Sequence, residues 1–300
     1  MMTNSFFGSI LTEMTSRVVS RSTQHTFLQS RRALTTLRLV AGGYCVPHPD
    51  KGDQGEDAWF MTPRSVGVAD GVGGWAAHGV DSGAYARELM SASREHDVES
   101  SSRARPLEIL HAGYAHVQRR RDLGSATACI ASVVDEDIEV ANLGDSGMML
   151  LRRDVAGWEI VVRSTEQQHT FNCPLQLGSE SADVPDDAQI LTVPICEGDL
   201  MIVGTDGIFD NLFDHELIAL VEEASEAHAT RASSGEGADA SFDVDALARS
   251  VVRASTAVAV DMEIDTPFSE NAKNYGYDTK GGKMDDMTVV CALIAPAEER

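Results

Sequence analysis

The sequence predicts an α+β fold in which two antiparallel sheets are flanked by helices, a four-layer α-β-β-α sandwich. From Tyr44 onward the chain consists of short runs of β-branched or apolar residues punctuated by Gly and Asp. Several of these runs follow one another closely enough to form hairpins, which favours antiparallel pairing. Other stretches carry apolar residues at helical spacing and supply the outer layers.

The first elements after Tyr44 are a strand and two helices. Residues 65–69 form a short apolar run that is typical of a buried strand. Asp81 or Ser82 can cap a helix that runs to about residue 96. A second helix is expected over residues 106–121, because proline suits the first turn of a helix.

Strands dominate the middle of the chain, and helices dominate its last third. We expect strands at residues 125–134, 138–143, 148–152, 158–163, 199–204 and 287–295. We expect helices at residues 214–224, 244–260 and 267–275. Residues 225–242 are rich in Ala, Ser, Gly and acids, which predicts a surface loop without a functional site.

Composition narrows the class of protein. Three hundred residues with 43% hydrophobic content favour one substantial domain, here residues 41–300, after a leader at residues 1–40. The formal net charge of −23 argues against nucleic acid as a partner, since such binding needs clustered Lys and Arg. Five scattered cysteines suggest buried thiols rather than disulfides or a zinc site. No apolar run reaches about 18 residues, so no membrane span is expected.

The leader differs from the rest of the chain. It holds five arginines, one acid, no lysine and thirteen Ser or Thr residues. This composition is typical of an organelle transit peptide, and Leu11, Met14 and Val18 recur at helical spacing. We expect a mitochondrial address, with a plastid as the alternative. A Ser/Thr-rich disordered tail without a targeting role is the other reading.

Four acid-bearing segments lie at the ends of short apolar runs. They are Gly55-Glu56-Asp57, Ala69-Asp70-Gly71, Gly204-Thr205-Asp206-Gly207 and Met284-Asp285-Asp286-Met287. A single acid beside a turn glycine is usually a turn former, but four at strand ends converge on one rim of a sheet. Carboxylate oxygens are the ligands that Mg²⁺ and Mn²⁺ prefer. The pattern therefore predicts a hydrolytic metal site.

Two cations about 4 Å apart can hold a phosphoryl oxygen, lower the pKa of a water and offset charge in an in-line displacement. Asp70 is the best candidate for a carboxylate that bridges both, because Gly71 exposes its carbonyl as a further ligand. Glu56, Asp206 and Asp285 are the natural flanking ligands.

Five segments resemble the successive motifs of the metal-dependent, type 2C protein Ser/Thr phosphatases. They are residues 55–57, 66–74, 142–147, 204–211 and 283–290, and the resemblance extends over residues 44–295. It implies a central β-sandwich flanked by helices, with a binuclear Mg²⁺/Mn²⁺ site at one end. It implies Glu56 as a ligand of one metal, Asp206 and Asp285 as ligands of the other, and Asp70 with the Gly71 carbonyl in both regions of the site.

The resemblance implies two further features. Asp145, in Gly-Asp-Ser-Gly, matches the acid that holds a third, weaker metal in many relatives. Residues 70–75, 168–172 and 281–286 resemble the organelle-targeted branch of the family most closely, in agreement with the leader.

The chain departs from the family pattern at two positions. Many relatives have a His after the Asp-Gly pair that protonates the leaving alkoxide, whereas Val72 stands here. His78, His169 or a metal-bound water are the alternatives for the general acid. Many relatives also hold phosphate with an Arg four residues before the ligand Glu, where this chain has Gly52 next to Lys51. Lys51 is therefore a candidate phosphate contact.

Other polar residues near the motifs have candidate roles. Asp57 and Asp286 are expected to orient metal-bound waters. The segment around His169, Phe171 and Asn172 is either a turn that packs Phe171 onto the core or a substrate-recognition element. Ser146 is an unpromising nucleophile, because no His-Asp pair is marked out to activate it.

The expected function is hydrolysis of phosphoserine and phosphothreonine in phosphoprotein substrates, with Asp70 and Asp206 central to catalysis and two Mg²⁺ or Mn²⁺ ions as cofactors. One alternative is a pseudophosphatase that shields phosphosites. Another is a metal hydrolase of small phosphomonoesters or nucleotides. The sequence names neither the substrate protein nor the oligomeric state.

Overall fold

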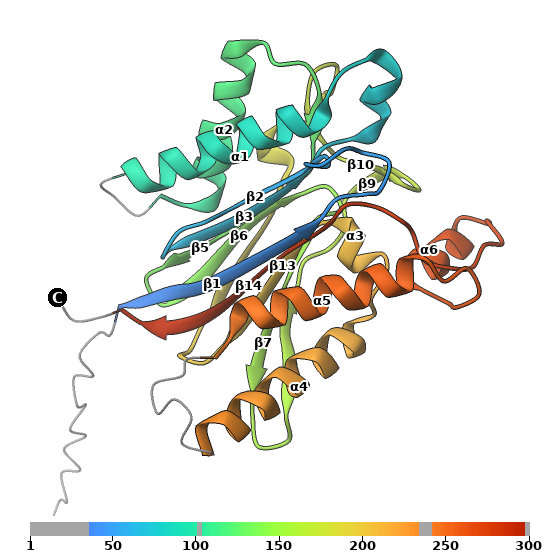
Figure 1. The fold of residues 1–300 in the computed structure, drawn as a ribbon. Helices are drawn as coiled ribbons and strands as arrows, with labels where there is room; N and C mark the ends of the chain where they lie inside the picture. Colours follow the sequence, from blue (N-terminus) through green and yellow to red (C-terminus); the bar gives the residue numbers. More distant parts are fainter. Residues whose placement is uncertain (1–35, 101–103, 234–241, 298–300) are drawn as a thin grey trace, which may run out of the picture. The chain divides into compact units, whose positions relative to one another are not determined.

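The structure is a computed structural model that describes residues 36–100, 104–233 and 242–297. Its centre is a pair of five-stranded antiparallel sheets (Figure 1). The first sheet has the order β1 (Leu37–Val46), β14 (Met287–Pro296), β13 (Leu200–Gly204), β7 (Gly147–Arg153) and β8 (Trp158–Arg163). The second has the order β12 (Gln189–Pro194), β6 (Asp137–Leu143), β5 (Ala128–Val134), β3 (Ser65–Asp70) and β2 (Asp57–Met61).

Helices cover the outer face of each sheet (Figure 1). On the second sheet lie α1 (Ser82–Glu99) and α2 (Pro106–Arg120). On the first sheet lie α4 (Asp214–Ser233) and α5 (Val244–Ala259). The predicted four-layer α-β-β-α sandwich is therefore confirmed.

Short elements complete the fold. They are η1 (Gly73–His78), η2 (Pro185–Asp187), α3 (Asp206–Phe209), α6 (Pro267–Asn274), and two small ladders that pair β4 (Ser125–Ala126) with β11 (Leu177–Gly178) and β9 (Gln168–Thr170) with β10 (Cys173–Pro174). None of the described helices combines the length and the apolar character needed to cross a membrane.

The layers are held by three apolar clusters: one between the sheets and one between each sheet and its helices. Strand β13 shows how one segment serves two of them. Leu200 and Ile202 pack under α4 and α5, whereas Met201 and Val203 pack between the sheets. Successive side chains of a strand point to opposite faces, so a run that is apolar throughout belongs between two apolar layers.

The structure corrects several expected boundaries. The single strand expected over residues 125–134 is two strands, β4 and β5, because at Thr127 the backbone leaves β4 and donates to the Asp70 carbonyl oxygen at 2.9 Å. The prediction of a loop over residues 225–242 was wrong for residues 225–233, which belong to α4. Trp158 contacts the start of the added turns, where its indole N–H donates to Ser225 Oγ at 3.0 Å. Residues 234–241 lie outside the described residues.

Strands β1 and β12 and the short strands β9, β10 and β11 were not expected, and β2 was expected only as an apolar run beside Gly55-Glu56-Asp57. Strand β1 pairs along its whole length with β14, from Leu37 opposite Pro296 to Val46 opposite Met287. The boundary expected between residues 40 and 41 therefore falls inside a strand. The helical repeat expected in the leader lies outside the described residues.

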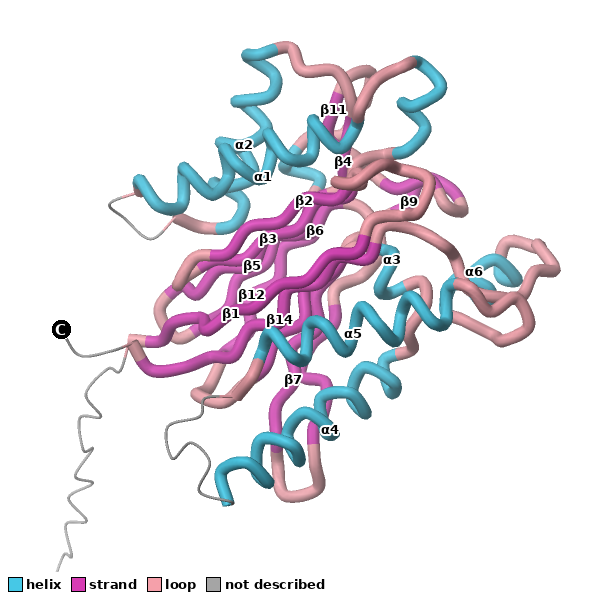
Figure 2. Tube along the Cα trace, in the orientation of Figure 1, coloured by secondary structure: helices cyan, strands magenta, loops and turns pink. Residues whose placement is uncertain are grey.

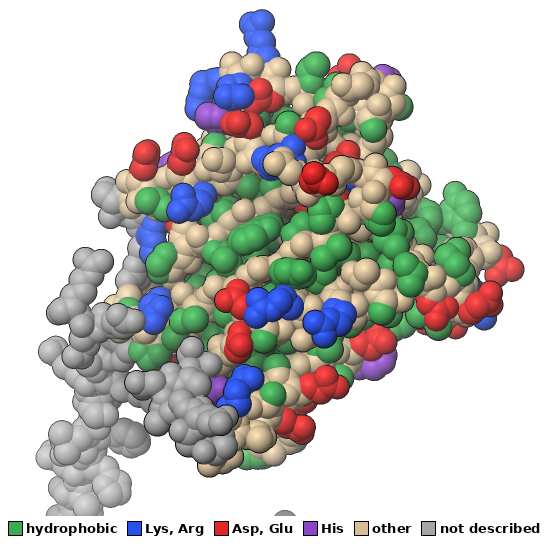
Figure 3. All heavy atoms as spheres, viewed as in Figure 1, with side chains coloured by type: hydrophobic (Ala, Val, Ile, Leu, Met, Phe, Trp, Pro, Cys, Tyr) green, Lys and Arg blue, Asp and Glu red, His purple; other side chains and the backbone are tan. Residues whose placement is uncertain are grey.

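Strands β1 and β2 are edge strands of their sheets, and Trp59 of β2 packs over Gly43 of β1. Figure 3 shows apolar side chains in a band across this face of the molecule. Tyr44 and Trp59 are among the exposed large apolar residues.

Candidate metal centre

The strand registers bring the predicted acids to one end of the sandwich. Asp70 ends β3 and is paired with Asp57, which begins β2. In the other sheet Gly204, which ends β13, is paired with Gly147, which begins β7, and with Val289 near the start of β14. Antiparallel neighbours place the end of one strand beside the start of the next. The acids that precede β7 and β14 and those that follow β3 and β13 therefore share one rim, where loops gather (Figure 2).

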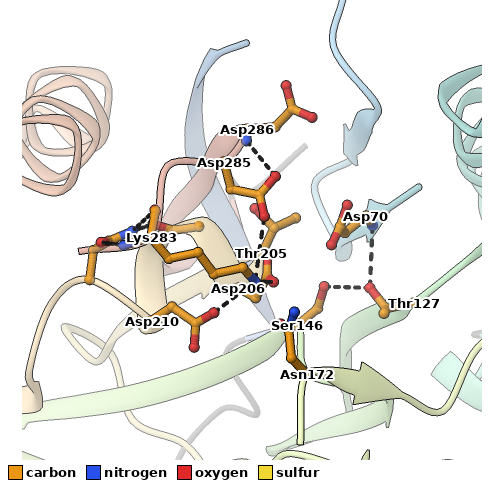
Figure 4. Close-up of polar contacts among 12 residues, drawn as sticks. Asp70, Thr127, Ser146, Asn172, Thr205, Asp206, Asp210, Lys283, Asp285 and Asp286 are labelled. Atoms are coloured by element: carbon orange, nitrogen blue, oxygen red, sulfur yellow. Dashed lines mark hydrogen bonds and ion pairs between the residues drawn. The ribbon is translucent and has the colours of Figure 1, made fainter. Parts of the chain in front are cut away.

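Three of these acids form a cluster. Asp70, Asp145 and Asp206 each offer a carboxylate oxygen, and the three oxygens lie within 4.8 Å of one another. Figure 4 shows Asp70, Asp206 and Asp285 extending from separate segments toward the same region. Asp145, which the family pattern links to a weaker site, thus stands beside the proposed bridging acid. Glu56 and Asp285 are not part of this three-oxygen cluster.

The donor set suits a hard divalent cation. Asp145 Oδ1 and Asp206 Oδ1 are buried oxygens without a hydrogen-bond partner among the described residues. Burial, and then the negative charge of Asp206, raises the pKa of Asp70 and of Asp145 well above the usual range. A cation shared by these carboxylates would offset the repulsion and satisfy the unpaired oxygens, and Mg²⁺ and Mn²⁺ prefer such oxygen ligands.

Glu56 approaches from the loop before β2. Ser82 Oγ donates to Glu56 Oε1 at 2.8 Å, so the N-terminal end of α1 orients this carboxylate. Gly71 is pressed against the same loop: a Cβ there would lie 2.7 Å from the Glu56 carbonyl oxygen and from the Ser82 backbone. Only glycine allows the two segments to approach this closely.

Asp286 anchors the loop that carries Glu56. Its side chain is 1% exposed and accepts hydrogen bonds from the backbone N–H groups of His48 at 2.8 Å and Glu56 at 3.0 Å. Asp57 Oδ2 accepts from Thr205 Oγ1 at 2.8 Å. Burial, and then the charge of Asp286, raises the pKa of Asp57. Both acids, which were expected to orient water, are thus engaged by protein groups that fix neighbouring strand ends.

Lys51 lies among carboxylates. Its Nζ is 2.8 Å from Glu56 Oε2, 2.9 Å from Asp285 Oδ1 and 3.1 Å from Asp286 Oδ2. The side chain expected to contact phosphate therefore neutralises the acids of the centre in this structure. Although burial opposes it, the charges of Lys283 and Lys51 hold the pKa of Asp285 below its usual range.

A hydroxyl pair supports the other side of the centre (Figure 4). Thr127 Oγ1 accepts from the Asp70 backbone N–H at 3.3 Å and lies 2.7 Å from Ser146 Oγ. Ser146 is thus a buried hydroxyl that pairs with Thr127.

Comparison with known proteins identifies the family. Residues 65–262 match the family model described as Stage II sporulation protein E (SpoIIE). The chain is 33% identical over 276 residues to "Probable protein phosphatase 2C 26" of Arabidopsis thaliana, and the match covers 86% of this chain and 84% of that protein. The chain belongs to the type 2C protein phosphatase family. Type 2C phosphatases are metal-dependent hydrolases that use Mg²⁺ or Mn²⁺.

Two further comparisons describe the extent of the likeness. The chain is 40% identical over 271 residues to "Probable protein phosphatase 2C 55" of Arabidopsis thaliana, and it spans 53% of that longer protein. Among solved structures, the X-ray structure of the photosystem II phosphatase PBCP is 30% identical, with a TM-score of 0.73 over 85% of this chain and 98% of that one. The type 2C sandwich is thus shared across nearly the whole described chain.

The two histidines predicted as alternatives for the general acid, His78 and His169, contact other residues. His78 is exposed in η1, with its ring 6.2 Å from that of Trp75. His169 is exposed and lies 2.9 Å, through Nε2, from Asp183 Oδ2. Neither is a member of the three-oxygen cluster.

Phe171 packs neither onto the core nor into the acid cluster. Its ring centroid lies 5.2–5.5 Å from those of Phe268, Tyr275 and Tyr277, in and after α6. The β9–β10 turn is therefore tied to the α6 segment by aromatic contacts.

Sequence reasoning missed three residues at the centre: Lys283, Asp210 and Asn211. Lys283 Nζ forms an ion pair with Asp206 and lies 2.9 Å from Asp210 Oδ2. Asn211 binds the backbone of Lys283. The signal for Lys283 was present, because the lysine stands two residues before a predicted ligand in Gly-Gly-Lys-Met-Asp-Asp. No such signal marks Asp210 and Asn211, whose position at the centre follows from α3, the short helix directly before them.

Proposed function

We propose that this chain is a protein serine/threonine phosphatase that hydrolyses phosphoserine and phosphothreonine in phosphoprotein substrates. The observation that carries the proposal is the convergence of Asp70, Asp145 and Asp206 from three separate strand ends, with their oxygens within 4.8 Å. Membership of the type 2C family supports the same reaction.

The ligand assignment is part of this proposal. Two Mg²⁺ or Mn²⁺ ions would be held by Glu56, Asp70 with the Gly71 carbonyl, Asp206 and Asp285, and Asp145 would contribute to a third, weaker site. The buried unpaired oxygens of Asp145 and Asp206 support it. When bound, the ions supply Lewis-acid stabilisation of the phosphoryl oxygens and lower the pKa of a water that attacks phosphorus.

The remaining work falls to residues of the chain itself. Thr127 holds the backbone of Asp70, and Ser82 fixes one oxygen of Glu56, so both carboxylates are pre-positioned. Lys51, on the rim between Glu56 and Asp285, can turn to the phosphate as its acids engage cations. Val72 carries no transferable proton and both candidate histidines are engaged elsewhere, so we propose that water protonates the leaving alkoxide.

We also propose that residues 1–40 direct the chain to an organelle. Their arginine-rich, acid-poor composition predicted a mitochondrion. The solved relative named as a photosystem II phosphatase favours the plastid alternative. A fluorescent protein fused behind residues 1–40 in plant cells tests this: diffuse cytosolic fluorescence would contradict both addresses.

Phosphate release from a phosphothreonine peptide by the full chain tests the proposed function. We expect release with Mn²⁺ or Mg²⁺ and none with chelator. Asp206→Asn should lower kcat by about a hundredfold or more, because the cluster loses a charged ligand. Asp278→Asn, an equal charge change at an exposed residue after α6, is the matched control and should leave the rate unchanged.

The alternatives give different results in the same assay. A folded chain that binds phosphopeptide without releasing phosphate would be a pseudophosphatase. Faster hydrolysis of nucleotides than of the phosphopeptide would point to a small-molecule phosphomonoesterase. Either outcome would overturn the proposed function.

A further inference from the structure

Lys283 is a largely buried lysine inside the acidic centre. Its side chain is 16% exposed, and its Nζ contacts three carboxylates: Asp206, Asp210 at 2.9 Å and Asp285 at 3.4 Å. Two of these, Asp206 and Asp285, are proposed metal ligands. A buried ammonium ion is stable only when it is paired and hydrogen-bonded, so this placement depends on the acids.

The backbone around Lys283 is held as firmly as its side chain. The Asn211 side chain accepts from the Lys283 N–H at 2.9 Å and donates to the Lys283 carbonyl oxygen at 2.8 Å. Gly282 allows the close approach to α5, since a Cβ there would lie 2.5 Å from Ala259 Cα and 2.8 Å from Asn211 Oδ1. The backbone contacts of this loop therefore fix the position of Lys283 beside the carboxylates.

Lys283 differs from Lys51, the other lysine at the centre. The two approach Asp285 from opposite sides, with Lys51 on Oδ1 and Lys283 on Oδ2. Only Lys283 also contacts Asp206, whose carboxylate belongs to the cluster with Asp70 and Asp145. Of these two lysines, Lys283 is thus the one that contacts a carboxylate of the three-oxygen cluster.

Asp210 gives Lys283 a partner outside the cluster. Asp210 Oδ2 is 2.9 Å from Lys283 Nζ, and Asp210 is not a member of the three-oxygen group. Figure 4 shows Lys283 extending between Asp206 and Asp210. The lysine can therefore release Asp206 and keep an ion pair.

We propose that Lys283 is a competing cation that sets the concentration of divalent metal at which the centre fills. Its ammonium group and a divalent ion bind the same carboxylates, Asp206 and Asp285, so each must displace or repel the other. In the absence of metal, Lys283 neutralises the acids and keeps them in place. In its presence, Lys283 is held by Asp210. This inference rests on the proposed metal centre.

The test is Mn²⁺ binding to the full chain by calorimetry, together with thermal unfolding in chelator. For Lys283→Met we expect Mn²⁺ to bind about tenfold more tightly, since a positive charge within a few ångströms of the ion is removed. In chelator the same variant should unfold at a lower temperature than the wild type, because the acids lose a counter-charge. A lysine with a merely structural role would lower both the metal affinity and the unfolding temperature.

Controls keep these outcomes distinct. Lys280→Met removes the same charge from an exposed position three residues away and should change neither readout. If Lys283→Met does not fold, Lys283→Gln replaces it in the test, because glutamine keeps hydrogen-bond donors without the charge. It should likewise bind Mn²⁺ more tightly than the wild type. Unchanged or weaker Mn²⁺ binding by a folded Lys283 variant would overturn this inference alone. A wild type that binds no Mn²⁺ would overturn the proposed centre and this inference with it.

Discussion

Asp210 shows what one residue does to the pH dependence of the metal-free protein. Burial raises its pKa to about 7, although Lys283 opposes the shift. Between the ordinary carboxyl pKa of 3.8 and about 7, the folded chain holds a proton that the unfolded chain has lost. The free energy of unfolding therefore falls as pH rises through this window. The raised pKa values of Asp70 and Asp145 act in the same direction.

We expect the chelated protein to lose on the order of 2 kcal/mol of stability between pH 5 and pH 7. Urea unfolding at both pH values, in chelator, measures the loss. Asp210→Asn has no carboxyl to titrate and should show a smaller loss. Equal losses of stability between pH 5 and pH 7 in the wild type and the variant would contradict this account of Asp210.

Among single residues, the acids of the centre were easier to predict from the sequence than the ion pairs of the lysines beside them. Glu56, Asp70, Asp206 and Asp285 stand beside turn residues at the ends of apolar runs, and that local pattern survives into the fold. The Lys51–Asp285 and Lys283–Asp206 ion pairs join residues more than two hundred and more than seventy positions apart, respectively. No local pattern encodes these two pairs, whereas Lys51–Glu56 and Lys283–Asp285 are close in the sequence.

Among the elements, strand β1 has the clearest testable role. Leu39 is buried between the sheets, and Val40 packs against the cluster under α4 and α5. A chain that begins at residue 41 lacks both, as well as the β14 pairing of residues 37–40. We expect it to be less stable than a chain that begins at residue 36 by at least about 2 kcal/mol, the usual cost of deleting one buried leucine side chain.

Thermal unfolding of the two truncated chains beside the full chain checks the role of β1. We expect the chain from residue 36 to match the full chain. If the chain from residue 41 unfolded at the same temperature, the strand would contribute little and a leader boundary at residue 40 would be acceptable.

Elements with strong local signals were predicted well, including the edge strand β8, whereas the edge strands β1 and β12 were not. Helix α1 has its cap at Asp81, whose side chain accepts from the Ala84 N–H at 3.1 Å, and Pro106 begins α2. Strand β1 contains Gly42 and Gly43 and continues from an arginine-rich leader, so its period was obscured. The extra turns of α4 begin at Ser225, whose side chain accepts a hydrogen bond from Trp158, far away in the sequence.

For the whole molecule, the fold class followed from the sequence because a four-layer sandwich needs apolar runs with two buried faces and amphipathic helices to cover them. The position of the centre at one rim followed from antiparallel order. The organelle to which the leader directs the chain could not be predicted, because the transit peptides of more than one organelle have this composition.

The net charge of −23 leads to the last prediction, on metal and salt. A cation that binds only the folded chain stabilises it by about 2.7 kcal/mol at a hundred times its Kd. For a domain of this size we expect Mn²⁺ to raise the Tm by roughly 5–10 °C. NaCl at equal ionic strength only screens surface repulsion and should raise it by less. Asp206→Asn should lose the Mn²⁺ effect and keep the NaCl effect; equal shifts from both salts would mean general screening and no specific centre.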